Sequence, residues 1–130
     1  MPYVVDPILD SPIKLWEICS AVKKLKDNKA PGEDGIFFRF YKFAPINFLK
    51  EVLNTFNKIF FHETIPKSFR TSILTPIFKK GDPTDPVNYR GISLINTICK
   101  MFNTILLNRI TFWIESKNIL NEFQAGFRKN

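Results

Sequence analysis

Residues 78–90, FKKGDPTDPVNYR, separate two apolar runs and decide how the chain around them folds. Lys79 and Lys80 end the first run, and Gly81 then opens a stretch with two Asp-Pro pairs. Glycine permits a positive φ, proline fixes φ, and aspartate hydrogen-bonds nearby backbone, so this composition is typical of turns. The stretch therefore predicts a hairpin-like excursion that carries Lys79, Lys80 and Arg90 at its base.

The run before this excursion predicts a strand, and the run after it predicts a helix. Residues 72–78, SILTPIF, are rich in β-branched and aromatic side chains. Pro76 has no N–H for a sheet ladder, which favours an edge position or a bulge. We expect a small β-ribbon from about residue 71 to residue 89 and then a helix over residues 94–117. Lys100 and Arg109 lie among the polar positions of that helix.

Apolar residues at helical spacing predict two earlier helices. Ser11 as N-cap and Pro12 at the first helical position begin one of them. The other runs from about Pro45 to His62, and the dipole of its end explains His62 better than catalysis does. The whole chain is therefore predicted to be a helix-dominated α+β fold. Its most buried positions are expected to include Leu53, Phe56, Ile98, Phe102, Ile105 and Leu106.

Length and charge set the class of protein. The 130 residues fit one domain, which we expect to comprise residues 11–130 after a tail of residues 1–10. The chain has 19 Lys and Arg residues against 12 Asp and Glu, a net charge of +7. This balance favours a phosphate-bearing partner, although a cationic surface without such a partner is the alternative.

Cys19, Cys99 and the single histidine lack the number and spacing of a disulfide framework or a zinc cluster. The amino terminus has no secretory-signal pattern, and no apolar run reaches the length of a membrane-spanning helix. We therefore expect an intracellular protein, in the nucleus or the cytoplasm, without a membrane partner or a cofactor.

Residues 37–43, FFRFYKF, interleave aromatic and cationic side chains and allow two interpretations. Such a segment can stack on the bases of a single strand while its cations contact phosphates. Alternatively it forms a short helix whose Phe side chains pack into the core. The second interpretation is favoured because the following helix needs apolar partners.

Residues 27–35 predict a loop, since Pro31, Gly32 and Gly35 interrupt any helix. A phosphate-cradling role is disfavoured, because the Walker pattern is absent and Glu33 and Asp34 would repel phosphate. An architectural role is the favoured interpretation.

Three blocks of the sequence resemble reverse transcriptases of non-LTR (LINE-like) retrotransposons, and they occur in the same order. They are KAPGEDGI at residues 29–36, IFKKGDPTDPVNYRGISL at residues 77–94 and QAGFR at residues 124–128. The resemblance implies a truncated reverse-transcriptase domain, in which the fingers side is present and the catalytic palm and the thumb are lacking. The activity of that family is RNA-directed DNA polymerisation.

The resemblance also implies roles for particular cations. The family's lysine after the first fingers strand and the arginine of its YR-P-IS block contact the triphosphate of the incoming nucleotide, and they match Lys79 and Arg90. Lys80 is the rival of Lys79, because neighbouring strand residues point to opposite faces. The alternative is that these cations are solvated turn residues. Weaker candidates for contact with a nucleic-acid backbone are Lys100, Arg109 and Arg128.

The family's catalytic carboxylates follow the QAGFR block, and this sequence contains no [FY]-x-Asp-Asp motif. We therefore predict no catalytic or metal-binding residue, no turnover of a small molecule, and Mg²⁺ only in the complete polymerase. The expected partner is RNA or an RNA/DNA hybrid. Two alternatives are a protein-interaction module that uses the exposed fingers surface and the front part of a complete polymerase.

Overall fold

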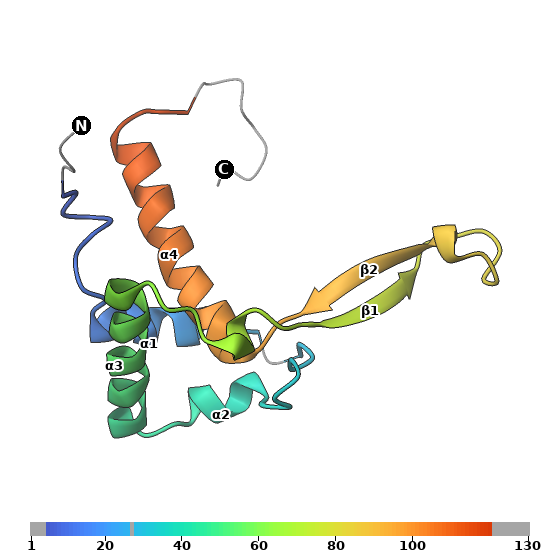
Figure 1. Ribbon diagram of the computed structural model, residues 1–130, viewed down its shortest axis with the longest axis horizontal. Coiled ribbons are helices and arrows are strands. Elements are labelled where there is room, and N and C mark those ends of the chain that lie inside the picture. Colours follow the sequence, from blue (N-terminus) through green and yellow to red (C-terminus); the bar gives the residue numbers. More distant parts are fainter. Residues whose placement is uncertain (1–4, 27, 121–130) are drawn as a thin grey trace.

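The computed structural model describes residues 5–26 and 28–120, which form a helical body and a two-stranded antiparallel ribbon (Figure 1). The predicted class, a helix-dominated α+β fold, is confirmed. The elements, in chain order, are α1 (Leu15–Lys24), α2 (Phe38–Lys42), α3 (Ile46–His62), the 3₁₀ helix η1 (Lys67–Phe69), β1 (Ile73–Phe78), the 3₁₀ helix η2 (Pro86–Asn88), β2 (Tyr89–Leu94) and α4 (Thr97–Ser116).

The core of the body lies where α1, α3 and α4 meet. Phe56 of α3 is completely buried and packs edge-on against Phe102 of α4, with ring centroids 5.1 Å apart. The predicted burial of Phe56, Phe102 and Ile105 is confirmed. Leu53 and Leu106 are only partly buried, as is Ile98, because they pack at the margin of this cluster. The prediction of deep burial is wrong for these three residues.

The start of α1 differs from the prediction. Lys14, and not Ser11, is the N-cap, and its backbone N–H donates to Glu17 Oε2 at 2.8 Å. The carbonyl groups of Ser11 and Pro12 instead accept hydrogen bonds from Arg109. Because these carbonyls are held by a distant side chain, the segment before Lys14 stays outside the helix.

α3 begins and ends where the sequence predicts. Pro45 is its N-cap, and Glu63 ends it in a left-handed conformation with φ 52°. Asn57 ties this helix to the chain before α1, since its amide oxygen accepts from the Ile13 N–H at 2.7 Å and its amide nitrogen donates to the Ile13 carbonyl at 3.0 Å.

The ribbon is longer than predicted. β2 continues to Leu94, which pairs with Ile73, and α4 begins only at Thr97. The predicted helix start at residue 94 is therefore wrong, because the ladder with β1 holds the apolar residues that follow Arg90. Pro76 lies in a two-stranded sheet, where each strand is an edge strand, as predicted. The ribbon extends away from the helices (Figure 1), and neither of its strands contains a buried residue.

α2 is the short helix that the sequence predicts, but most of its Phe side chains do not join the core. Phe38 and Tyr41 are buried, whereas Phe37, Phe40 and Phe43 are 58%, 53% and 83% exposed. A helix of five residues turns only one side toward the body, so the remaining rings face outward. The predicted packing is wrong for these three residues.

Both cysteines are free, and Cys99 is buried whereas Cys19 is half-buried. Within the ranges 5–26 and 28–120, no helix has the length and apolar character needed to cross a membrane.

Candidate phosphate-binding site

The loop between the strands is held by its own side chains. Gly81 has φ 98°, and a Cβ added there would lie 2.8 Å from the Asn88 amide nitrogen. Asp82 Oδ1 accepts from both the backbone N–H and the hydroxyl of Thr84, at 2.8 and 2.7 Å. Asp85 Oδ1 accepts from a backbone N–H two residues further on. The predicted turn roles of these residues are confirmed.

Two further bonds close the loop onto the ribbon. The Asn88 side-chain amide donates to the Asp82 carbonyl at 3.0 Å, and the Tyr89 hydroxyl donates to the Pro83 carbonyl at 2.8 Å. The Lys79 N–H donates to the Asn88 carbonyl at 2.8 Å, which continues the ladder beyond the last pair of the sheet. The backbone that carries the basic residues is therefore fixed.

Lys79 and Arg90 lie at the loop end of the ribbon, Arg90 within β2 and Lys79 directly after β1. Arg90 pairs with Ile77, and cross-strand partners share a face, as do strand residues two positions apart. Lys79 and Arg90 line the same surface hollow of about 330 Å³, together with Ile77, Phe78 and Lys80. All three cations are exposed, and the hollow has no acidic lining.

Lys80 remains a rival of Lys79. Strand alternation would place Lys80 with Phe78 and Tyr89 on the other face, but Lys80 and Phe78 both line the hollow as well. Its part in binding therefore stays a prediction, as do those of Lys79 and Arg90.

The root of the ribbon is joined to the loop of residues 27–35 by a buried asparagine. Asn96, the N-cap of α4, accepts from the Asp34 N–H at 3.2 Å and donates to the Ser68 carbonyl at 3.2 Å. A Cβ added to Gly32 would lie 2.3 Å from Asn96 Oδ1, so only glycine fits against this junction. These contacts support the architectural interpretation of the loop.

The first turn of α4 strengthens the same junction. The Thr97 hydroxyl donates to the Ile36 carbonyl at 3.0 Å, and Lys100 Nζ donates to the Ala30 carbonyl at 3.4 Å. Lys100 thus has a structural contact, and its predicted contact with nucleic acid stays untested. Sequence reasoning missed Asn96, whose only local signal is an asparagine directly before a helix.

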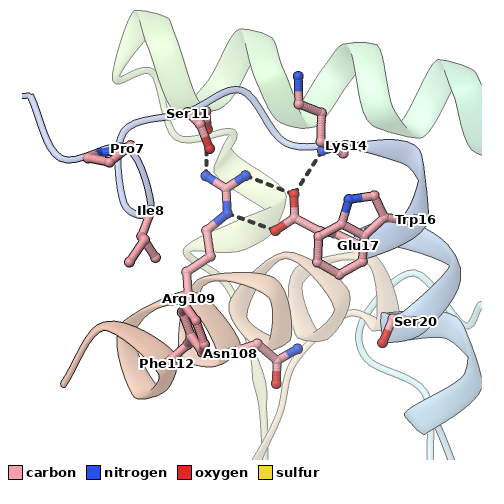
Figure 2. A pocket seen from close by; sticks show the side chains of 10 residues that line it. All are labelled: Pro7, Ile8, Ser11, Lys14, Trp16, Glu17, Ser20, Asn108, Arg109 and Phe112. Carbon is pink, nitrogen blue, oxygen red and sulfur yellow. Dashed lines mark hydrogen bonds and ion pairs between the residues drawn. The ribbon is translucent and has the colours of Figure 1, made fainter. Parts of the chain in front are cut away.

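Arg109 is not a surface cation, contrary to the prediction. It is 7% exposed, and its Nε and Nη2 donate to the two carboxylate oxygens of Glu17 at 2.7 and 2.8 Å. The guanidinium also donates to the Ser11 carbonyl at 2.5 Å (Figure 2). It donates to the Pro12 carbonyl at 3.0 Å as well. Because these groups occupy its donors, we do not propose Arg109 as a phosphate ligand. Arg128 lies outside the described residues.

The ion pair sets the charge state of Glu17. Burial alone would raise the pKa of this carboxyl, but the hydrogen bonds from Arg109 and from the Lys14 N–H outweigh burial, and its pKa is lowered. Phe60 adds a cation–π contact to Arg109 at 5.6 Å from the ring centroid. Sequence reasoning missed Glu17, which lies 92 positions before its partner.

A cavity of about 270 Å³ lies beside this ion pair (Figure 2). Trp16 of α1 and Phe112 of α4 contribute to its lining, and both are largely exposed. Two of its polar lining residues, Glu17 and Arg109, are already bonded to each other. Within the described part of the chain, no group of three or more His, Cys, Asp or Glu residues could hold a metal ion.

The chain is related to the RNA-directed DNA polymerases of non-LTR retrotransposons, as the three sequence blocks indicate. It is 36% identical over 118 residues to the RNA-directed DNA polymerase from mobile element jockey of Drosophila funebris. It is 33% identical over 124 residues to the probable RNA-directed DNA polymerase from transposon X-element of Drosophila melanogaster, and 30% identical over 119 residues to that from transposon BS of the same species.

These alignments cover 90%, 92% and 91% of this chain, in the order just given. The chain spans only 13%, 14% and 13% of the length of the same relatives. No protein-family model matches the sequence. The chain therefore corresponds to a small segment of such a polymerase.

Proposed function

We propose that this chain is the fingers side of a reverse-transcriptase domain and that its ribbon binds the phosphates of a nucleotide or a nucleic acid. The observation that carries the proposal is that Lys79 and Arg90 line one exposed hollow of a ribbon that extends away from the body (Figure 1). The relationship to RNA-directed DNA polymerases supports a phosphate-bearing ligand.

The two side chains are suited to different parts of the same anion. The Lys79 ammonium is a compact point charge, whereas the planar Arg90 guanidinium can donate two parallel hydrogen bonds to phosphate oxygens. The held loop and the ladder keep the two backbones in place, so little ordering of the backbone accompanies binding.

We further propose that the chain by itself binds and does not polymerise. Nucleotide transfer in this family uses carboxylates that hold two metal ions, and the sequence contains no [FY]-x-Asp-Asp motif. We expect no incorporation of labelled nucleotide on a primed RNA template with Mg²⁺ or Mn²⁺. Incorporation above a heat-inactivated control would contradict this part of the proposal.

The binding proposal is tested with Lys79→Ala and Arg90→Ala, using a nucleoside triphosphate and a labelled RNA as ligands. Each change should weaken binding and reduce its dependence on salt, because each removes a contact that displaces counterions. Lys80→Ala is the matched variant, since it removes the same charge one residue away. Lys50→Ala, on the exposed surface of α3, is the distant control.

A weaker effect of Lys80→Ala than of Lys79→Ala would support a common face for Lys79 and Arg90. Equal losses in all four variants would show that binding depends on net charge alone, and the ribbon site would be wrong. Unchanged binding in both Lys79→Ala and Arg90→Ala would also overturn it.

A second candidate function is a protein-interaction module, which the exposed apolar residues of the body favour. Trp16, Leu107 and Phe112 are 70%, 63% and 62% exposed on α1 and α4. Association with another protein through these residues would be insensitive to salt, unlike phosphate binding. Salt-insensitive association that Leu107→Asp abolishes would support this function.

A further inference from the structure

We propose a second nucleic-acid site on α2, where exposed phenylalanine rings stack on the bases of a single strand. Phe37, Phe40 and Phe43 follow one another at intervals of three residues, and all three rings are more than half exposed. Phe40 lies within α2, whereas Phe37 is its N-cap and Phe43 its C-cap. We call these three exposed rings the aromatic row, which is separate from the cations of the ribbon.

Phe40 is held in place by two neighbouring rings. Phe40 is edge-on to Phe48 of α3 and to Tyr41, with ring centroids 5.3 and 5.5 Å apart and interplanar angles of 89° and 88°. The entry to α2 is fixed by the bond from the buried Thr97 hydroxyl to the Ile36 carbonyl. A base can therefore stack on Phe40 without first ordering that side chain.

The charge between the rings favours nucleic acid over a protein partner. The exposed positions from Phe37 to Phe43 carry only phenylalanine, Arg39 and Lys42, and none is acidic. Phenylalanine and arginine are enriched at protein interfaces, but lysine is depleted there, whereas single-strand binders combine aromatic platforms with cations that follow the phosphates. The net charge of +7 agrees with a polyanionic ligand.

The test compares two labelled strands of equal length, a single-stranded oligoadenylate and an abasic strand with the same phosphates. Wild-type chain should bind the oligoadenylate more tightly, since only that strand can stack. Phe43→Leu, at the most exposed ring, should weaken oligoadenylate binding about tenfold and leave the abasic strand unchanged. Phe43→Trp keeps an aromatic face and should retain wild-type binding to both strands.

Leucine is the informative substitute because it keeps apolar character and loses the aromatic face. If Phe43→Leu binds oligoadenylate as the wild type does, the stacking site is wrong. Phe61→Leu is the matched control, because Phe61 is 54% exposed but lies on α3. An equal loss in Phe61→Leu would also overturn the proposal, since it would show a general effect of exposed rings.

This site and the ribbon site can fail independently. Arg90→Ala should weaken both strands to the same extent, because it removes a phosphate contact, whereas Phe43→Leu should affect only the strand with bases. If Phe43→Leu instead relieves self-association of the chain without changing oligoadenylate binding, the aromatic row is a protein contact and the proposal is wrong.

Discussion

The helical body and the β-ribbon are stabilised in different ways. In the body, rings such as Phe56 and Phe102 are packed in an apolar core, and Arg109 bonds α4 to α1 and to the segment before it. In the ribbon, Leu74 is 69% exposed, and the structure depends on the ladder, the bonds of the loop and one edge-on contact between Phe78 and Tyr89.

Because of this difference, we expect global stability to depend on the body and phosphate binding to depend on the ribbon. An isolated two-stranded hairpin is marginally stable in water, so the ribbon depends on its junction with the body at Asn96. Lys79 and Arg90 are exposed and line a hollow of the ribbon, so a ligand in solvent can contact both. Substitutions in the body should therefore change global unfolding, whereas substitutions in the ribbon should change local opening and binding.

The largest effect is expected from Arg109→Met. This change leaves Glu17 buried without its partner and frees the carbonyls of Ser11 and Pro12, so it should lower the free energy of unfolding by about 3–5 kcal/mol. Urea unfolding followed by circular dichroism measures this loss.

The double variant Glu17→Met, Arg109→Met provides the control. It should be more stable than Arg109→Met alone because no unpaired buried charge remains, but less stable than wild type because the two carbonyls stay unpaired. A loss below about 1 kcal/mol in Arg109→Met would show that the ion pair behaves as an exposed one.

The next comparison sets Phe56→Ala in the body against Leu74→Ala in the ribbon. Phe56 is fully buried, so its truncation leaves a cavity and should cost about 3–5 kcal/mol. Leu74→Ala should cost less than about 0.5 kcal/mol, because most of that side chain already contacts solvent. The same urea experiment measures both, and equal costs would contradict the division between the two regions.

Leu106 tests the margin of the core in the same series. The sequence predicts a loss of about 2–5 kcal/mol for Leu106→Ala, as for other core truncations. Because the side chain is only partly buried, we now expect a loss at or below the lower end of that range.

Local signals in the sequence predicted the elements with strong punctuation. Pro45 and the Thr-Ile-Pro segment after His62 marked both ends of α3, and Gly81 with its Asp-Pro pairs marked the loop of the ribbon. In each case the residue acts through its own backbone, so no knowledge of distant partners was needed.

The parts that sequence reasoning missed depend on distant partners. The apolar run from Ile92 to Ile98 fits either a strand or a helix, and only pairing with β1 decides where β2 ends. Arg109 looks like any helix cation until Glu17 and the carbonyl of Ser11 are placed beside it. In the candidate site, the resemblance of the sequence blocks singled out Lys79 and Arg90, and the structure adds that both line one hollow.

A smaller and local effect is expected from Gly81→Ala. A side chain at φ 98° is strained and would approach the Asn88 amide, so closing the loop should cost about 1–3 kcal/mol more. Hydrogen exchange of the Lys79 N–H, which is bonded across the loop to Asn88, should become faster. Gly35→Ala is the matched control for backbone strain alone. Its φ of 64° is positive, as at Gly81, but an added Cβ meets nothing within 4 Å.

The exchange of helix amides should stay at wild-type rates in Gly81→Ala. If the amides of α3 and α4 exchange faster as well, the ribbon and the body unfold as one unit. The separation of stability from binding would then be wrong.

The smallest effects are expected on lowering the pH. In the body they should change global stability, whereas in the ribbon they should change only local opening of the loop. The pKa of Glu17 lies below its ordinary value of 4.5 in the folded chain, so the folded state binds fewer protons than the unfolded chain near that pH. The stability that Glu17 contributes is therefore present above pH 4.5 and is lost as the pH falls through the lowered pKa. Urea midpoints should decrease over this window.

Asp82, in the loop of the ribbon, is the acidic group that we compare with Glu17 of the body. Hydrogen bonds from the Thr84 hydroxyl and N–H lower its pKa, so acid should also loosen the loop, but only the exchange of nearby amides should report it. Glu17→Gln should flatten the acid dependence of the urea midpoint, and Asp82→Asn should leave that dependence intact. If Asp82→Asn flattens that dependence instead, the loop contributes to global stability. The contrast between the helical body and the ribbon would then be wrong.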